Sequence, residues 1–524
     1  MNASPSIAAR LVEGAARRPR AIALVSARGV RIDYGTLAAQ VAALATALKS
    51  DGLGAGDRVL LFVPMSIELY IALLACLHLG ATAVFVDAWA DRRRLDAAVR
   101  AARPRAFLGA PRAHLLRLLS REVRAIPIAR MVTRAWLAAC ARDAAPCPAA
   151  EVAADQAALI TFTTGSTGTP KAAARSHAFL WAQHEVLAAH LGTVETDVDL
   201  PTLPVFVLHD LACGACAVLP DADPRRPGDI DPARVYEQIV RERVTTTTAS
   251  PAFFERLLPW CEKTRHPLPL RALFTGGAPV LPALARRLAA ALPGRRAEVL
   301  YGSTEAEPIA AIGAAEMLAA LDEGPGGIAP EGLCVGAPVP QIVVRIVRPQ
   351  AGPITLGPEG WDAWELAPGE TGEVVVSGAH VLTGYLDDPE ADCANKIGDG
   401  ARVWHRTGDA ARLDDRGRLW LMGRVRERVV RDGRTWWTLP PELRALAVPG
   451  VTHAAYLGLP GGLSGPRALL AVECSATGES GLEARLRAAV APWPVDRVAL
   501  LERIPRDPRH ASKTDLEALR RRLG

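Results

Sequence analysis

Thr163-Thr-Gly-Ser-Thr-Gly-Thr-Pro-Lys171 is the stretch on which the assignment of the fold depends, and an apolar segment, 157–162, leads directly into it. Its nine positions hold two glycines, five hydroxyl residues and one lysine. Glycines let backbone N–H groups turn toward an anion, hydroxyls donate to phosphate oxygens, and lysine adds positive charge. The GxxxxGK[ST] spacing of the common P-loop is absent. The segment alone therefore predicts either a phosphate-binding turn after a strand or a plain polar surface loop.

Around this loop, segments typical of strands and of helices alternate. Short apolar runs that end in Gly, Pro or charged residues have the length of buried strands, and longer amphipathic runs lie between them. This alternation predicts an α/β fold with mainly parallel sheet layers and helices on both faces. The expected strands are 21–26, 57–63, 83–86, 157–162, 245–248 and 272–275, and the expected helices are 34–48, 67–79, 253–258 and 281–292.

The pattern changes after about residue 330. Short β-type runs at 342–347 and 373–377 are separated by Gly and Pro turns, which favours a distorted β-barrel or a β-rich subdomain over about 330–422. An apolar strand at 418–421 closes this region, and the residues beyond it form a smaller α/β segment. We therefore expect a large domain over 1–422 and a small C-terminal lid domain over 423–524.

Composition and charge narrow the class of protein. The chain has 524 residues, 50% hydrophobic and 22% charged, so it can bury at least one large core and is not a disordered, collagen-like or coiled-coil chain. The net charge of +5 is well mixed along the chain and does not suggest a nucleic-acid partner. The basic segment from Arg503 onward is either a solvated helix face or a cationic segment presented to phosphates.

Cysteine usage and the N-terminus bear on location. The chain has nine cysteines, an odd number, and no secretory signal is recognisable, so we expect reduced thiols and a cytoplasmic protein. Cys213 and Cys216 form one CxxC with apolar flanks and no second pair, which favours packed thiols over a zinc site. The longest apolar run, 69–86, is interrupted by His78, Gly80 and Thr82, which favours a buried helix and strand over a transmembrane segment.

Four further motifs stand beside the loop in a fixed order. They are Tyr301-Gly-Ser-Thr-Glu305, His405-Arg-Thr-Gly-Asp409, Gly423-Arg424 and, close to the C-terminus, Lys513. Together with Thr164-Gly-Ser-Thr-Gly-Thr-Pro-Lys171, this order resembles that of the AMP-forming adenylating enzymes, which include acyl-CoA synthetases, nonribosomal adenylation domains and luciferases. The resemblance covers about residues 155–515. It implies an enzyme that joins a carboxylate to ATP, giving acyl-AMP and pyrophosphate.

The resemblance also implies a role for each matching residue. Lys171 and the loop hydroxyls would hold the β- and γ-phosphates, and Tyr301 would stack on adenine. Asp409 would accept both ribose hydroxyls, and Arg424 would contact ribose or phosphate near the hinge. The nucleotide-binding residues implied in this way are Thr164, Gly165, Ser166, Thr167, Gly168, Lys171, Gly276, Gly277, Ala278, Tyr301, Gly302, Asp409 and Arg424.

Three residues would act on the reacting groups. Glu305 would hold Mg²⁺, a hard cation that prefers carboxylates and phosphate oxygens, and Thr304 would contact the α-phosphate. Lys513 would bridge the α-phosphate and the acyl oxygen. The chemistry needs such positioned charges, because two anions must meet while charge builds up on the α-phosphate.

The chain departs from the family pattern at three places. Ala172 replaces the glycine that usually follows the loop lysine, and Arg426 stands at the hinge position two residues after Arg424. His209 lies near the acyl-pocket motif, but its spacing is shifted. It is either a gating ring or, as we favour, a pocket-wall or structural residue.

Softer motifs concern the second half-reaction. The stretches 199–204, 221–224, 301–308 and 505–513 are similar to those of the β-lactone synthetases of bacterial olefin biosynthesis. That similarity implies adenylation of a fatty or β-hydroxy fatty acid and then ring closure by the substrate's own hydroxyl, without a thiol. An acyl-CoA or carrier-protein ligase, which would add coenzyme A to the cofactors, and a non-catalytic nucleotide-binding relative are the alternatives. The similarity suggests that the partners are the small carboxylic acid substrate and other enzymes of the same pathway.

Overall fold

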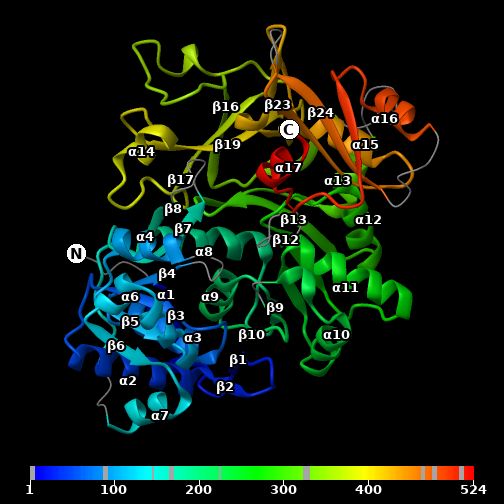
Figure 1. Ribbon diagram of the computed structural model, residues 1–524. Helices are drawn as coiled ribbons and strands as arrows, with labels where there is room; N and C mark the ends of the chain where they lie inside the picture. The colour runs from blue at the N-terminus through cyan, green and yellow to red at the C-terminus, as the bar shows by residue number, and fades with distance from the viewer. Residues whose placement is uncertain are drawn as a thin grey trace.

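Two large sheets organise the chain in the computed structural model, which describes residues 6–86, 92–143, 147–164, 170–223, 226–322, 331–461, 466–474, 481–506 and 513–524. The elements of the first third lie together at one end of the molecule, and those of the last hundred residues lie at the other (Figure 1). Among the described residues, no helix has both the length and the apolar character needed to cross a membrane.

The first sheet has six strands and carries the predicted phosphate-binding turn. Its order is β6 (Ile128–Met131), β5 (Ala106–Gly109), β3 (Arg58–Phe62), β4 (Thr82–Phe85), β7 (Ala157–Thr164) and β8 (Pro170–Ser176). All neighbours are parallel except β7 and β8, which pair antiparallel with Thr163 opposite Lys171. The two ends of the loop therefore lie on adjacent strands.

The apolar run at 69–86 is a buried helix followed by a strand, as predicted. Helix α3 (Ile67–His78) begins at Ser66, whose side chain accepts a hydrogen bond from the Leu69 N–H, and β4 follows it. Helix α2 (Tyr34–Ser50) packs beside α3, and their leucines and alanines form the core on this side of the sheet. Burial of apolar side chains on all sides of α3 explains its sequence without a membrane.

The second sheet has fourteen strands and joins the parallel part to the β-rich part. Its parallel section contains β10 (Cys216–Val218), β9 (Val198–Pro201), β11 (Thr246–Ala249), β12 (Ala272–Gly276) and β13 (Arg296–Ser303), with β1 (Ile22–Val25) and β2 (Arg31–Asp33) at its far edge. Beyond β13 the pairing is antiparallel through β14 (Ala306–Gly313), β15 (Leu333–Pro338), β20 (Leu419–Arg424), β19 (Val403–Leu413), β17 (Gly372–Gly378) and β16 (Ile342–Val347), and β18 (Lys396–Gly398) pairs with β19.

The α/β class and the β-rich segment are thus present. Helices α8 (His177–Leu191), α9 (Pro204–Cys213), α10 (Pro232–Arg241), α11 (Pro251–Thr264), α12 (Pro282–Ala291) and α13 (Ala314–Asp322) accompany the second sheet. Its antiparallel strands continue the sheet, and no closed barrel forms among the strands that the structure describes. Two helices are longer than predicted, since α11 begins before 253 and extends past 258 to Thr264, and α2 extends past 48 to Ser50.

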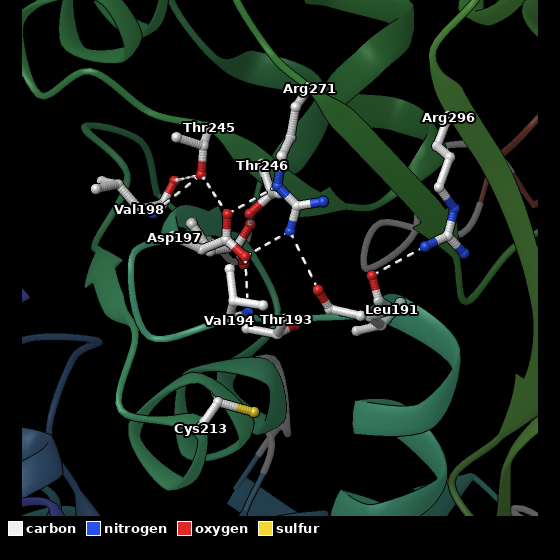
Figure 2. A network of polar contacts seen from close by, with 12 residues as sticks. Leu191, Thr193, Val194, Asp197, Val198, Cys213, Thr245, Thr246, Arg271 and Arg296 are labelled. Atoms are coloured by element: carbon white, nitrogen blue, oxygen red, sulfur yellow. Dashed lines mark hydrogen bonds and ion pairs between the residues drawn. The ribbon is translucent and has the colours of Figure 1, made fainter.

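A polar network holds the connection between α8 and β9 in place (Figure 2). Asp197 is 3% exposed and accepts hydrogen bonds from Arg271 Nε at 2.8 Å, Thr245 Oγ1 at 2.9 Å and the Val194 N–H at 2.9 Å. Although burial opposes ionisation, these donors hold the pKa of Asp197 below its usual value. The network ties the start of β9 to the residues that precede β11 and β12.

The last part of the chain forms a small three-stranded sheet of β23 (Val451–Leu459), β24 (Arg467–Cys474) and β25 (Arg497–Leu501). Helices α15 (Leu439–Leu446), α16 (Leu482–Val490) and α17 (Leu516–Leu523) accompany it, in orange and red in Figure 1. Leu443 of α15 packs into the same core cluster as Trp420 of β20. The domain boundary at 422 and 423 stays a prediction.

Candidate active site

Tyr301, Asp409 and Arg424, predicted from separate motifs, meet in one cluster. The Tyr301 hydroxyl donates to Asp409 Oδ2 at 2.8 Å, and Arg424 Nη1 donates to Asp409 Oδ1 at 2.8 Å. Strands β13, β19 and β20 supply the three residues, and Asp409 lies opposite Arg424 in the β19–β20 ladder. Burial, then the Asp409 carboxylate, raises the pKa of Tyr301 well above its usual value, so the phenol stays a donor.

A glycine turn ends the neighbouring strand β12. A Cβ at Gly276 would lie 2.6 Å from the Leu300 carbonyl oxygen, and Gly277 has a φ of +82°, which favours glycine. Leu300 directly precedes Tyr301 on β13, and Ala278 follows the turn. Gly276 thus allows close pairing with β13 one residue before Tyr301, and the open space at the Cβ position of Gly277 leaves backbone that a flat ring can approach.

Glu305 lies in a second cluster, which also contains two lysines. The Tyr385 hydroxyl donates to Glu305 Oε1 at 3.0 Å. The ammonium groups of Lys171 and Lys396 lie 5.3 Å and 5.0 Å from the centre of the Tyr385 ring. Two cations and the Glu305 carboxylate around one phenol, with Asp388 and Asp392 close by, make a site suited to a polyanion that carries a divalent cation.

Burial weakens the charge of both lysines. Desolvation lowers the pKa of Lys171, although the nearby Glu305 and Asp388 act to raise it. Desolvation also lowers the pKa of Lys396 to about 8. Lys396 Nζ lies 3.2 Å from Nδ1 of His405, a buried residue whose pKa burial and then Lys396 hold well below its usual value. Each ammonium group therefore gains from an added negative charge.

The residues at Glu305 also fit a hard cation. Tyr385 holds Oε1, and no hydrogen bond between described residues reaches Oε2. A carboxylate with one oxygen oriented by a phenol and the other accessible is a suitable ligand for Mg²⁺, which keeps waters and phosphate oxygens as its other ligands.

Thr304 stands between the two clusters. Its carbonyl oxygen accepts a hydrogen bond from Arg175 Nη2 at 3.0 Å. Arg175 is 6% exposed and comes from β8, just after the phosphate loop. Gly302, two residues earlier, has no room for a side chain, because a Cβ there would lie 2.8 Å from the Ala306 carbonyl oxygen. The turn that bears Thr304 and Glu305 is therefore packed against β8.

Part of the predicted site lies outside the described residues. This holds for Gly165, Ser166, Thr167 and Gly168, and nothing is described of the side chain of Thr164, which ends β7. The neighbour of Lys513, Thr514, is bonded through Oγ1 to His453 Nε2 of β23 at 2.9 Å, which ties this segment to the small sheet. The role of Lys513 stays a prediction.

His209 has the features of a structural residue. It is 2% exposed on α9, with Nδ1 3.1 Å from His184 Nδ1 and Nε2 3.1 Å from Thr193 Oγ1. Cys213 lies one turn further along α9, with its sulfur 3.7 Å from His209 Nε2. Burial lowers the pKa of His209 to about 3, so the ring is neutral. The cysteines form no disulfide, and all of them lie in the described ranges.

Sequence reasoning missed three residues of this site, namely Arg175, Tyr385 and Lys396. Tyr385 follows Gly384 and belongs to none of the motifs described above, and Lys396 stands alone among acidic neighbours. A signal existed for Arg175, since an arginine in an otherwise apolar strand needs a buried partner. Only the tertiary pairing of residues far apart in sequence reveals the other two.

Comparisons with known proteins bear on the family and the fold. A family model described as AMP-binding enzyme matches residues 11–386. The chain is 36% identical to an olefin beta-lactone synthetase of Stenotrophomonas maltophilia, covering 88% of this chain and 86% of that one. It is 34% identical to the olefin beta-lactone synthetase of Xanthomonas campestris, covering 98% and 96%. The fold is similar to that of ATP-bound MatB from Rhodopseudomonas palustris, with a TM-score of 0.82 and 23% identity over 99% of this chain and 98% of that chain.

Proposed function

Since this chain belongs to the AMP-binding enzyme family and is an AMP-forming carboxylate ligase, we propose that it adenylates a β-hydroxy fatty acid and then closes a β-lactone. The observation that carries the adenylation step is the pair of adjoining clusters, one built on Asp409 and the other on Glu305. The first suits a ribose with its base, and the second suits a magnesium-bound phosphate chain.

In this proposal the first cluster binds the nucleoside. Asp409 keeps lone pairs beyond those used by Tyr301 and Arg424, so its two oxygens accept the ribose hydroxyls. The Gly276–Gly277 turn and the Tyr301 ring provide the flat surface for adenine. Arg424 stays near the ribose, where it also orients Asp409.

The second cluster binds the phosphates. Lys171 and Lys396 neutralise the triphosphate, Glu305 holds the Mg²⁺ that screens the phosphate charge, and Thr304 contacts the α-phosphate. The attacking carboxylate is also an anion, so positioned cations lower the barrier by removing repulsion and stabilising the charge that develops as pyrophosphate leaves. Lys513 completes this set from the C-terminal segment. The roles of the loop residues follow the family pattern.

The lactone step rests on the two olefin beta-lactone synthetases, which align over most of this chain at 34 to 36% identity. The β-hydroxyl of the acyl adenylate attacks its own carbonyl and expels AMP. Because nucleophile and electrophile belong to one molecule, proximity supplies the rate advantage and no thiol is needed.

The test is product analysis with ATP, Mg²⁺ and β-hydroxy fatty acids of several lengths, with and without coenzyme A. The proposal predicts AMP and a β-lactone at equal rates in both arms. A thioester formed only with coenzyme A would identify a thioester ligase. Absence of AMP and pyrophosphate with every acid would identify a non-catalytic nucleotide-binding relative.

A further inference from the structure

The helical segment that follows β5 presents leucines to the outside of the molecule. It is a short 3₁₀-helix, η1 (Pro111–Leu115), that continues into α5 (Leu116–Leu119). Leu115, Leu118 and Leu119 are 57%, 70% and 63% exposed, which makes them the three most exposed large apolar side chains in the part of the chain that the structure describes. None of the residue roles above uses them.

The three leucines lie on one face of this segment. Their spacing of i, i+3 and i+4 places them together on a helix, and the backbone is helical at both Leu115 and Leu116, where η1 joins α5. The opposite face points inward, because Ala113 and Ser120 are buried. Leu116 packs against the core cluster that contains Val123. A surface helix ordinarily shows its polar face to water, so this arrangement indicates a partner for the leucines.

The end of this segment is held by α6 (Arg121–Ala125), which follows it. Arg124 donates through Nε to the Arg117 carbonyl oxygen at 2.8 Å and through Nη2 to the Leu118 carbonyl oxygen at 2.7 Å. These bonds satisfy carbonyl groups that the end of a helix leaves open. Val123 anchors α6 in the core beneath. The leucines therefore lie on a fixed corner of the fold, where they form a preformed contact surface.

Positive charge is concentrated in the same region, although the charge of the whole chain is mixed. From the start of α4 (Arg92–Ala102) to the end of α6 the chain has ten arginines and two acidic residues, a net charge of +8, whereas the whole chain carries +5. Glu122 pairs with Arg100 at 3.2 Å. Asp96 accepts a hydrogen bond from Ser120 Oγ. Both acidic residues are thus already engaged, and the remaining positive charge attracts an anionic partner.

Some of these arginines adjoin the leucines. Arg112 lies one turn before Leu115, and Arg121 lies two residues after Leu119. Both arginines are exposed, and neither has a carboxylate within ion-pair distance among the described residues. Helix α4 packs beside α6 (Figure 1), and its exposed first turn, 92–94, consists of three more arginines. The outward leucines therefore have basic residues on both sides.

We propose that this face, formed by Leu115, Leu118 and Leu119 with the arginines around them, docks the protein on the surface of an anionic lipid bilayer. The leucines enter the boundary between headgroups and acyl chains, and the guanidinium groups contact lipid phosphates. A bilayer offers both hydrocarbon and negative charge, whereas a nucleic acid offers outward leucines no apolar layer. This inference goes beyond the proposed function and does not depend on it, because docking needs neither ATP nor an acid.

Sedimentation of the full chain with lipid vesicles tests the proposal, in the absence of ATP and of any acid substrate. We expect binding to vesicles of phosphatidylglycerol and phosphatidylcholine in equal parts, and at least about 10-fold weaker binding to phosphatidylcholine alone. Binding to the anionic vesicles should weaken at least about 5-fold between about 0.05 M and about 0.5 M salt, because salt screens the charge of the arginines.

A leucine variant keeps the charge and removes the apolar face. It carries Leu115→Gln, Leu118→Gln and Leu119→Gln, and its partition coefficient on anionic vesicles should fall at least about 10-fold. The matched control replaces three exposed valines that lie on separate elements, namely Val12→Gln, Val240→Gln and Val430→Gln. The control should bind as wild type does. Undiminished binding by the leucine variant would overturn the proposal.

A charge variant keeps the leucines and weakens the basic rim. Arg112→Gln with Arg121→Gln removes two exposed arginines, and binding at low salt should fall at least about 5-fold. Arg28→Gln with Arg286→Gln makes the same change in net charge at exposed positions on other elements, and it should leave binding unchanged. Equal losses in the two charge variants would show that net charge alone attracts the vesicles, and would refute a specific docking face.

The remaining outcomes are equally decisive. Wild type that stays in solution with anionic vesicles would overturn the proposal. If wild type then forms a dimer by light scattering and the leucine variant is a monomer, the leucine face is an interface between two copies of the chain. Melting temperatures of all four variants close to that of wild type would confirm that the changes act at the surface, as expected for exposed side chains.

Discussion

At the scale of single residues, the site is organised by side chains that orient other side chains. Tyr385 orients Glu305, Tyr301 and Arg424 orient Asp409, and Arg175 supports Thr304. A side chain that is already held in its binding orientation loses little conformational freedom when it binds a nucleotide or a cation. Changes to these supporting residues should therefore alter affinity while leaving the fold intact.

Tyr385→Phe tests the support of Glu305. The variant keeps the ring between the two lysines and loses the 3.0 Å hydrogen bond to Glu305. We expect the Mg²⁺ concentration for half-maximal pyrophosphate exchange to rise about 10-fold, the usual scale for loss of a group that orients a metal ligand. Tyr236→Phe removes a hydroxyl bonded to a carbonyl far from the site and is the control. An unchanged Mg²⁺ requirement in Tyr385→Phe would separate Glu305 from metal binding.

The lowered pKa of Lys396 predicts how kcat/KM for ATP depends on pH. Burial lowers its pKa to about 8, so the free enzyme loses this positive charge as the pH rises through that value. The kcat/KM for ATP, which reports groups of the free enzyme, should therefore fall above pH 8. Lys396→Arg keeps its charge at every accessible pH and should flatten this alkaline limb. If kcat/KM declines at the same alkaline pH in both proteins, the titrating group is not Lys396.

At the scale of elements, strand ends and the connections after them carry the chemistry, and buried polar networks fix those connections. The turn between β13 and β14 holds Thr304 and Glu305, the end of β12 holds the Gly276–Gly277 pair, and β7 and β8 bracket the phosphate loop. The Asp197 network performs the same task where α8 leads into β9 (Figure 2).

Asp197→Asn should destabilise the protein without changing the site's residues. The loss expected at neutral pH is about 3 kcal/mol, below the largest values for buried pairs because Arg271 is 41% exposed. The folded pKa is lowered, so the ion pair stabilises the protein above the ordinary aspartate pKa, and this contribution is lost as the pH falls below it. Urea unfolding should therefore give a difference from wild type that shrinks in acid. A difference independent of pH would contradict the role of the charge.

Helices and strands with a clear pattern of apolar residues could be predicted from the sequence. Contacts between residues far apart in the chain could not. The strand at 57–63 and the helix at 67–79 match β3 and α3 to within about a residue, because burial dictates both composition and length. The β-rich segment was expected as well, but only strand pairing decides that it extends a sheet. Tyr301, Asp409 and Arg424 were predicted from separate motifs and do meet, whereas Lys396 reaches the site only because β18 pairs with β19.

At the scale of the whole molecule, the account requires the small C-terminal segment to act on a site built by the large sheets. The two clusters proposed to bind the nucleotide come from β8, β12, β13, β18, β19 and β20, the turn between β13 and β14, and the segment around Tyr385, all of which precede the small sheet. Lys513 lies among the residues that follow that sheet. ATP binding and adenylation should thus depend on different parts of the chain.

Lys513→Ala tests that division. We expect acid-dependent pyrophosphate exchange to fall by at least about 10²-fold, since a positioned charge at the reacting phosphate is lost. ATP affinity measured by calorimetry should change by less than about 3-fold, because Lys171, Lys396, Asp409 and Tyr301 remain. Exchange at the wild-type rate would remove Lys513 from the mechanism.

The most direct test of the central claim, that an acyl adenylate forms at this site, follows oxygen from the substrate into AMP. A β-hydroxy acid whose carboxylate carries ¹⁸O in both positions is turned over with ATP and Mg²⁺ without any thiol, and the products are analysed by mass spectrometry. The account predicts one ¹⁸O in the phosphate of AMP and the other in the lactone carbonyl. AMP without label, or label in inorganic phosphate released together with ADP, would contradict it.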